Sequence, residues 1–143
     1  MWGNPGCFAS GDYSREFLGE VASYGVILIA PGNIGEFGSF TDVTWIRESM
    51  DWVSANAGRG NYAHVDGSRM AAWGRSCGGI EALMVARDSR IGHVGIFNAG
   101  STDEASSRSV VGRITKPVFY FMGGPADFTL SYVCSQYRAC TNE

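Results

Sequence analysis

The sequence predicts an α/β fold in which a mostly parallel sheet is flanked by helices. Short apolar runs alternate with segments of helical periodicity, which is the pattern of successive β-α-β units. One of these runs, residues 26–30, is continuously aliphatic, as in strands that are buried on both faces of a parallel sheet. Glycine and polar residues follow the predicted strands, and in parallel sheets the chemistry lies at the C-terminal ends of the strands.

The composition is that of one folded domain, residues 1–143. Apolar residues make up 45% of the chain, which is long enough to bury a core. The net charge of -3 gives no basic footprint, so we expect no nucleic-acid partner. No apolar run approaches the length of a membrane span, and no signal peptide is visible. The four cysteines form no zinc pattern, and we expect no metal and no cofactor.

The first part of the chain is expected to hold the end of a strand, a helix and a complete strand. Residues 1–10 are typical of a strand that runs into a glycine-proline loop. A helix is predicted over residues 14–24, and Gly25 would end it. Its apolar residues fall on one helical face: Phe17, Leu18, Val21 and Ala22. The aliphatic run at 26–30 is the predicted strand that follows.

The second predicted helix covers about residues 42–56, after a loop at 31–38. Thr41 or Asp42 would cap its N-terminus. Its buried stripe is Val43, Ile46, Met50 and Val53. The remaining expected elements are a strand at 70–73, a helix at 80–87, a strand at 93–97, a polar loop or short helix at 101–113, a strand at 117–122 and a helix at 128–138.

A serine stands between the strand at 70–73 and the helix at 80–87. Residues 74–78 have the pattern G-x-S-x-G, with Gly74 and Gly78 on either side of Ser76. This strand-turn-helix context is typical of the nucleophile elbow of serine hydrolases. In so tight a turn a Cβ at either glycine would crowd the neighbouring chain, and the serine lies beside a helix N-terminus that favours an oxyanion. A flexible glycine-serine turn is the alternative, because the bare motif is weak in a chain with 20 glycines.

Six motifs occur along nearly the whole chain in a familiar order and spacing. They are Trp2-Gly3-Asn4-Pro5-Gly6-Cys7, Gly25-Val26-Ile27-Leu28-Ile29-Ala30, His64-Val65-Asp66, Gly74-Arg75-Ser76-Cys77-Gly78-Gly79, Ile96-Phe97-Asn98-Ala99-Gly100 and Gly123-Gly124-Pro125-Ala126-Asp127. Together they resemble the α/β-hydrolase superfamily, and more narrowly its dienelactone-hydrolase and chlorophyllase-like serine hydrolases. The resemblance implies a partial α/β-hydrolase fold and a serine esterase that acts on a small-molecule ester. It also favours an extracellular location, because this branch is common among secreted microbial enzymes.

The resemblance implies catalytic roles for two residues. Ser76 would be the nucleophile and would form an acyl-enzyme that water then hydrolyses. Asp127 matches the triad acid, which would orient a histidine and stabilise its imidazolium form. The alternative for Asp127 is a turn-forming or helix-capping aspartate. Asp103 and Glu104 could supply another acid, although a polar surface loop explains them.

The oxyanion hole implied by the resemblance has two backbone donors. One is the N–H of Cys77, and the other comes from the loop at 3–7. Pro5 has no N–H, so Asn4, Gly6 and Cys7 remain candidates. A plain glycine-proline turn is the alternative for this loop.

The cysteines admit two pairings. A disulfide between Cys7 and Cys77 would brace the oxyanion loop against the elbow, whereas the alternative is two small buried thiols. Cys134 and Cys140 would pair only if the last helix ends near Arg138. A nucleophilic Cys77 is not expected, since Ser76 holds the apex of the elbow.

The chain departs from the family pattern in its histidines. The triad order places a histidine after the acid, but none follows Asp127. His64 and His93 are expected at the wrong edge of the sheet, in structural roles. Little of the strand before the loop at 3–7 is present, so the sequence resembles the middle of a hydrolase cut at both ends. We therefore expect little or no esterase activity, and the alternative is an inactive α/β-hydrolase-like domain that binds a small acyl ligand.

Two further features are expected to be structural. Trp45 and Trp52 are seven residues apart on a predicted helix, where such side chains more often pack than bind a ligand. The glycines at 32, 35 and 38 form no phosphate loop, because no G-K-[ST] follows them, and this argues against a nucleotide-binding flavodoxin-like domain.

Overall fold

The computed structural model of the chain describes residues 1–100, 105 and 109–124. Within them, four parallel strands form one sheet in the order β1-β2-β3-β4. The strands are β1 (Trp2–Gly3), β2 (Met70–Arg75), β3 (Ile91–Phe97) and β4 (Val118–Phe121). The prediction of an α/β fold built on a parallel sheet is confirmed.

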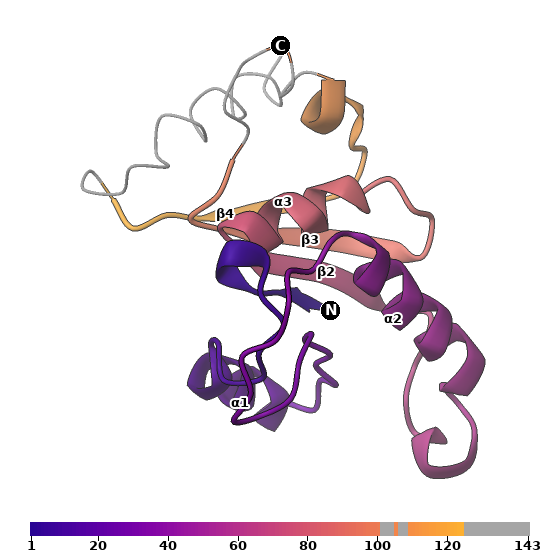
Figure 1. Cartoon of the computed structure of the whole chain (residues 1–143). Coiled ribbons are helices and arrows are strands. Elements are labelled where there is room, and N and C mark those ends of the chain that lie inside the picture. The colour runs from indigo at the N-terminus through magenta and orange to yellow at the C-terminus, as the bar shows by residue number, and fades with distance from the viewer. Residues whose placement is uncertain (101–104, 106–108, 125–143) are drawn as a thin grey trace.

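Helices lie on both sides of the sheet (Figure 1). The described helices are α1 (Arg15–Ser23), α2 (Thr44–Asn56) and α3 (Cys77–Met84), with short 3-10 turns η1 (Pro5–Cys7), η2 (Gly60–Tyr62) and η3 (Val111–Arg113). On the α1 side, the ring of Phe17 packs against the rings of Trp2 and Phe97. The predicted helix at 128–138 and most of the predicted polar segment at 101–113 lie outside the described residues.

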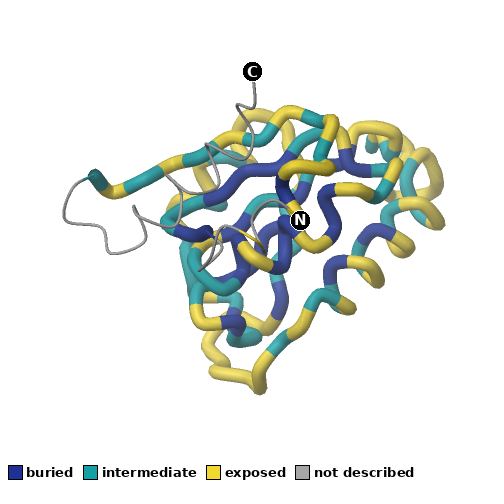
Figure 2. The backbone as a smooth tube through the Cα atoms, turned by 90° about the horizontal axis from the view of Figure 1, so that it is seen from above, coloured by how far each residue is buried: buried dark blue, intermediate teal, exposed yellow. Residues whose placement is uncertain are grey.

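The main core lies between the sheet and helices α2 and α3. Alternate residues of β2 and β3 point into it: Met70, Ala72, Val94 and Ile96. The predicted stripe of α2 is confirmed, because Ile46 and Met50 are fully buried while Val43 and Val53 are partly buried against the core. Figure 2 shows these buried stretches gathered in the sheet and on the facing sides of the helices.

Helices α1 and α2 lie within two residues of their predicted bounds, whereas α3 begins and ends three residues before the predicted helix at 80–87, because the helix starts directly after Ser76. Gly25 ends α1 with a φ of 82°, a left-handed conformation that favours glycine. At α2, the Asp42 carboxylate accepts a hydrogen bond from the Thr44 backbone N–H at 2.7 Å. The N-cap position itself is Val43, which makes no side-chain cap hydrogen bond, so neither Thr41 nor Asp42 holds the predicted position, although Asp42 bonds the first residue of the helix.

Residues 26–30 do not form the predicted strand buried on both faces. Val26 and Ile27 are 49% and 48% exposed, and the described contact with the sheet is one hydrogen bond from the Trp2 N–H to the Ile29 carbonyl at 2.8 Å. The segment therefore lies beside β1 but without a ladder. The physical reason is that β1 has two residues and offers few backbone groups to pair with.

The N-terminal amine is hydrogen-bonded to the sheet. It donates to the Ala71 carbonyl at 2.7 Å, while the Met1 carbonyl accepts from the Trp73 N–H at 2.9 Å. Burial disfavours the charged form and lowers the pKa of this amine from 8.0 to about 6.

Candidate functional site

Ser76 occupies the turn between β2 and α3 in a strained conformation. Its φ is 52° and its ψ is -125°, a region that costs a non-glycine residue about 1–3 kcal/mol. Three backbone hydrogen bonds hold it there. Its N–H donates to the Phe97 carbonyl at 2.9 Å, and its carbonyl accepts from Gly79 at 2.9 Å and from Ile80 at 3.3 Å. The residue as a whole is half-buried.

Three glycines let three backbone segments meet beneath this serine. A Cβ on Gly74 would overlap the carbonyl of Gly78, and a Cβ on Gly78 would overlap the carbonyl of Gly3. The crowding predicted at Gly74 and Gly78 is therefore confirmed. Sequence reasoning missed Gly3, whose only signal was its position at the end of the first strand.

Asn4 organises the loop that follows β1. Its side chain is fully buried, and its amide nitrogen donates to three carbonyls, those of Phe8 at 3.0 Å, Ser10 at 2.8 Å and Pro31 at 3.2 Å. Its backbone carbonyl accepts from Cys7 at 3.2 Å and from Gly78 at 3.1 Å. Asn4 thus fixes the loop against the elbow helix, a role that the sequence analysis did not foresee.

The backbone donors near Ser76 can now be compared. The N–H of Cys77 is at the first position of α3, where helix N–H groups have no partner within the helix. The N–H of Cys7 is bonded to Asn4, and Asn4 itself is buried. Gly6 is exposed in the η1 turn with a φ of 69°. Of the loop candidates, Gly6 is therefore the best placed to meet a ligand.

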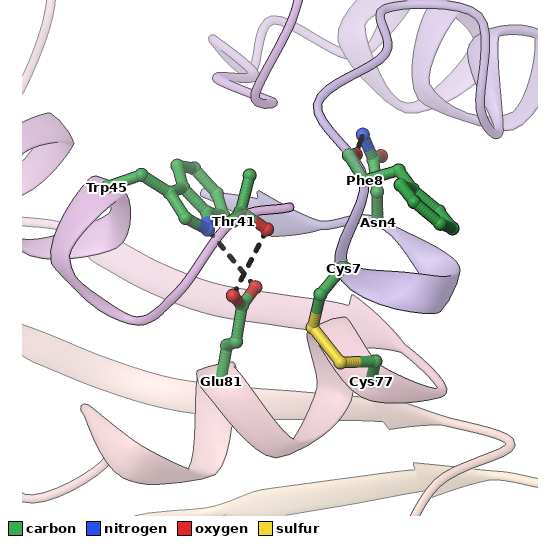
Figure 3. Close-up of a disulfide and its surroundings, with 7 residues drawn as sticks. All are labelled: Asn4, Cys7, Phe8, Thr41, Trp45, Cys77 and Glu81. Carbon is green, nitrogen blue, oxygen red and sulfur yellow. Dashed lines mark hydrogen bonds between the residues drawn. A yellow bond between two sulfur atoms is a disulfide. The ribbon is translucent and has the colours of Figure 1, made fainter. Parts of the chain in front are cut away.

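A disulfide joins Cys7 in the η1 turn to Cys77, the residue after Ser76 (Figure 3). The Cα atoms are 5.3 Å apart. The hypothesised pairing is confirmed, and the alternative of two buried thiols is wrong. Because the Cys77 sulfur is bonded, it is not a thiol nucleophile. Cys134 and Cys140 lie outside the described residues.

A buried carboxylate supports the elbow helix from its other side. Glu81 of α3 is 4% exposed and accepts hydrogen bonds from the Thr41 hydroxyl at 3.2 Å and from the Trp45 indole N–H at 3.1 Å (Figure 3). Trp45 also packs against the core, as expected for a structural tryptophan. Sequence reasoning missed Glu81, although a carboxylate within an apolar helical run was a usable signal.

Neither histidine can reach Ser76. His93 pairs with Ala71, five residues before Ser76, which is roughly 16 Å along the sheet at the usual rise per residue. Its ring lies between Trp73 and Phe119, and burial followed by the nearby N-terminal amine lowers its pKa. His64 is exposed and precedes β2, beyond the same edge. Asp127, Asp103 and Glu104 lie outside the described residues.

An open groove of about 730 Å³ adjoins the elbow on the α1 side of the sheet. Its lining includes Arg75, Phe97 and Asn98 at the ends of β2 and β3, and Arg15, Glu16 and Phe17 of α1. Both signs of charge line it, and Ser76 is not part of its wall. The groove therefore neighbours the candidate nucleophile without containing it.

The described part of the chain holds no helix that is long and apolar enough to cross a bilayer. It also brings together no group of three or more histidine, cysteine, aspartate or glutamate residues that could hold a metal ion.

The chain matches no protein-family model, no curated protein and no solved structure.

Proposed function

We propose that the elbow is the nucleophile site of a serine hydrolase that acts on carboxylic esters, built on a partial α/β-hydrolase fold. The observation that carries the proposal is the strained backbone of Ser76 at a strand-helix junction, held over contacting glycines. A plain surface turn does not need such strain, whereas a nucleophile elbow uses it to expose the hydroxyl.

The reaction would use groups that surround Ser76. Its Oγ attacks the ester carbonyl, the bond to the alcohol oxygen breaks, and the serine proton passes through a base to the leaving alkoxide. The N–H groups of Cys77 and Gly6 stabilise the charge on the carbonyl oxygen, assisted by the N-terminus of α3. Water then hydrolyses the acyl-enzyme. Asp127 is the proposed acid.

The base is the missing part. His93 pairs with Ala71, five residues before Ser76, which is far beyond the hydrogen-bond distance that proton transfer requires, and His64 is an exposed residue before β2. We therefore propose that this 143-residue chain carries the nucleophile and the oxyanion donors but turns over little or no ester. The same observation favours a second candidate, a domain that binds an acyl ligand without hydrolysing it.

A fluorophosphonate probe tests the proposal, with the modified residue located by mass spectrometry. We expect slow phosphonylation of Ser76, accelerated by added imidazole, which can act as the missing base. Ser76→Ala should remove this modification, and Ser39→Ala, in an exposed loop, should leave it unchanged. Modification spread evenly over other serines would contradict a nucleophile at Ser76. Fast labelling without imidazole would contradict the missing base, and acyl-ligand binding without labelling would support the second candidate.

A further inference from the structure

Three phenylalanines form a cluster next to the disulfide, here called the aromatic platform: the half-buried Phe8 and the exposed Phe37 and Phe40. The ring centroid of Phe8 is 4.6 Å from that of Phe37 and 4.5 Å from that of Phe40. Phe37 is 66% exposed and Phe40 is 74% exposed. Exposing apolar side chains to water is unfavourable, and contiguous exposed apolar surface on a protein is typical of a binding site.

The platform is built on two loops that are tightly joined. Backbone hydrogen bonds run from Ala9 to Ser39 at 3.0 Å, from Gly38 to Ala9 at 2.6 Å, from Gly11 to Asn33 at 2.9 Å and from Thr41 to Cys7 at 2.6 Å. A Cβ on Gly38 would come within 2.7 Å of the Ala9 carbonyl oxygen, so the two backbones are in contact. The loops therefore hold the rings in place while Phe37 and Phe40 stay largely exposed.

The platform is also fixed to the candidate active site. Phe8 directly follows Cys7, which is bonded to Cys77 with a Cα separation of 5.3 Å. One further residue adds about 3.8 Å, so the Cα of Phe8 lies within about 9 Å of the Cα of Cys77. Phe8 is thus the member of the platform that is tethered to the elbow, and the other two rings extend the apolar surface outward from it.

The charge of the two loops limits what that arm can be. Residues 3–14 and 31–42 contain Asp12, Glu36 and Asp42, but no lysine or arginine. Arg15 is ion-paired with Asp12 at 3.7 Å, and Arg75 lines the groove on the α1 side, so a carboxylate held over the rings would meet the acidic residues of these loops. We propose that the aromatic platform binds the neutral, apolar arm of the ester, an aryl or alkyl group, and so selects substrates for the site at Ser76. This inference rests on the proposed function, because only an enzyme has a substrate. The binding itself can be measured without turnover.

The test is a titration of the whole chain with 4-phenyl-2-butanone, a neutral ketone that cannot be hydrolysed, followed by NMR of the aromatic side chains. We expect saturable shifts at Phe8, Phe37 and Phe40, and no saturation with 3-phenylpropanoate, which carries a charge. The double variant Phe37→Ser/Phe40→Ser should raise Kd at least about fivefold, because these rings supply the contact area. The matched control is Tyr24→Ser, which removes a 79% exposed aromatic outside the platform and should leave Kd unchanged.

Several outcomes would overturn the proposal. If the double variant and the control bound the ketone with equal affinity, or if 3-phenylpropanoate bound as tightly as the ketone, the ligand would bind elsewhere. A concentration-dependent dimer that the double variant abolishes would assign the surface to a second copy of the chain. Circular dichroism checks that each variant folds. Ser76→Ala should bind the ketone as wild type does, so a failure of the proposed chemistry at Ser76 is distinguishable from a failure of the platform.

Discussion

The contact between Gly3, Gly74 and Gly78 sets the position of Ser76. Each lacks a side chain at a point where two backbone segments touch, so the ends of β1 and β2 and the first turn of α3 form one packed unit. A side chain here has no open space to occupy, and backbone atoms yield less readily than side chains. The strained serine is thus supported by the residues beneath it rather than by its own side chain.

Replacing Gly78 by alanine should therefore destabilise the protein. We expect the free energy of unfolding in urea to fall by about 3 kcal/mol, since the new Cβ would overlap the backbone of Gly3. Gly19→Ala is the matched control, because Gly19 lies in α1 with no atom within 4 Å of its added Cβ. That variant should be more stable by about 0.5–1 kcal/mol. Similar effects of the two substitutions would show that the elbow tolerates a side chain.

The prediction of single residues from the sequence succeeded where local spacing carries the signal. Gly74, Ser76 and Gly78 lie within five residues, and their pattern specifies one turn. Gly3 and Asn4 act on partners more than twenty residues away, at Gly78 and Pro31, and a single sequence does not show such pairs. The disulfide could be hypothesised because Cys7 follows the first strand and Cys77 directly follows Ser76 at the end of another strand.

At the scale of elements, α3 is held by polar contacts as well as by its apolar side. Glu81 links it to Thr41 and to Trp45, and thereby connects the elbow helix to the start of α2. A buried carboxylate costs desolvation, and its two donors offset that cost. The helix that presents Ser76 is thus fixed at its first residue by the disulfide and one turn later by this pair of hydrogen bonds.

Glu81→Ala should lower the free energy of unfolding by about 1–3 kcal/mol, because it leaves the indole N–H of Trp45 without its partner. Tryptophan fluorescence of the folded state should change as well. Glu48→Ala, on the exposed side of α2, provides the control and should alter the free energy by no more than about 0.5 kcal/mol. An equal change in the free energy of unfolding for the two variants would mean that the hydrogen bonds of the buried carboxylate do not stabilise the fold.

The elements that the sequence predicted correctly are those with a complete local pattern. Helix α2 has its stripe, and α1 has its glycine stop. Residues 26–30 failed because burial of an aliphatic strand depends on its neighbours, and β1 gives this segment a single hydrogen bond. Periodicity predicts what a segment can form, whereas pairing decides what it does form.

At the scale of the whole molecule, the two faces of the sheet differ. Helices α2 and α3 cover a core of fully buried residues on one face. On the other face, α1 packs over Trp2 and Phe97, while Phe119 and Phe121 of β4 remain 48% and 43% exposed. The candidate nucleophile, the oxyanion loop and the aromatic platform all depend on the segments around β1, the shortest strand of the described sheet.

The disulfide is the covalent link that holds this edge together. It closes a loop of 70 residues, and in the chain-entropy model a loop of that length stabilises the folded state by about 4 kcal/mol. Cys7→Ser/Cys77→Ser should therefore lower the free energy of unfolding by up to about that amount, as measured in urea. Cys7→Ser alone should cost nearly as much as the double substitution, because either change removes the cross-link.

Treatment with a reductant distinguishes the effect of the cross-link on stability from the effect of replacing the cysteine side chains. Reduction should destabilise the wild type toward the level of the double variant, while the double variant itself should respond little. The fluorophosphonate reaction of Ser76 should also slow in the reduced wild type, because the η1 turn that carries Gly6 is then tied to Cys77 only through backbone contacts. Unchanged stability and unchanged labelling after reduction would show that the hydrogen bonds of Asn4 hold the loop at 3–7 without the disulfide.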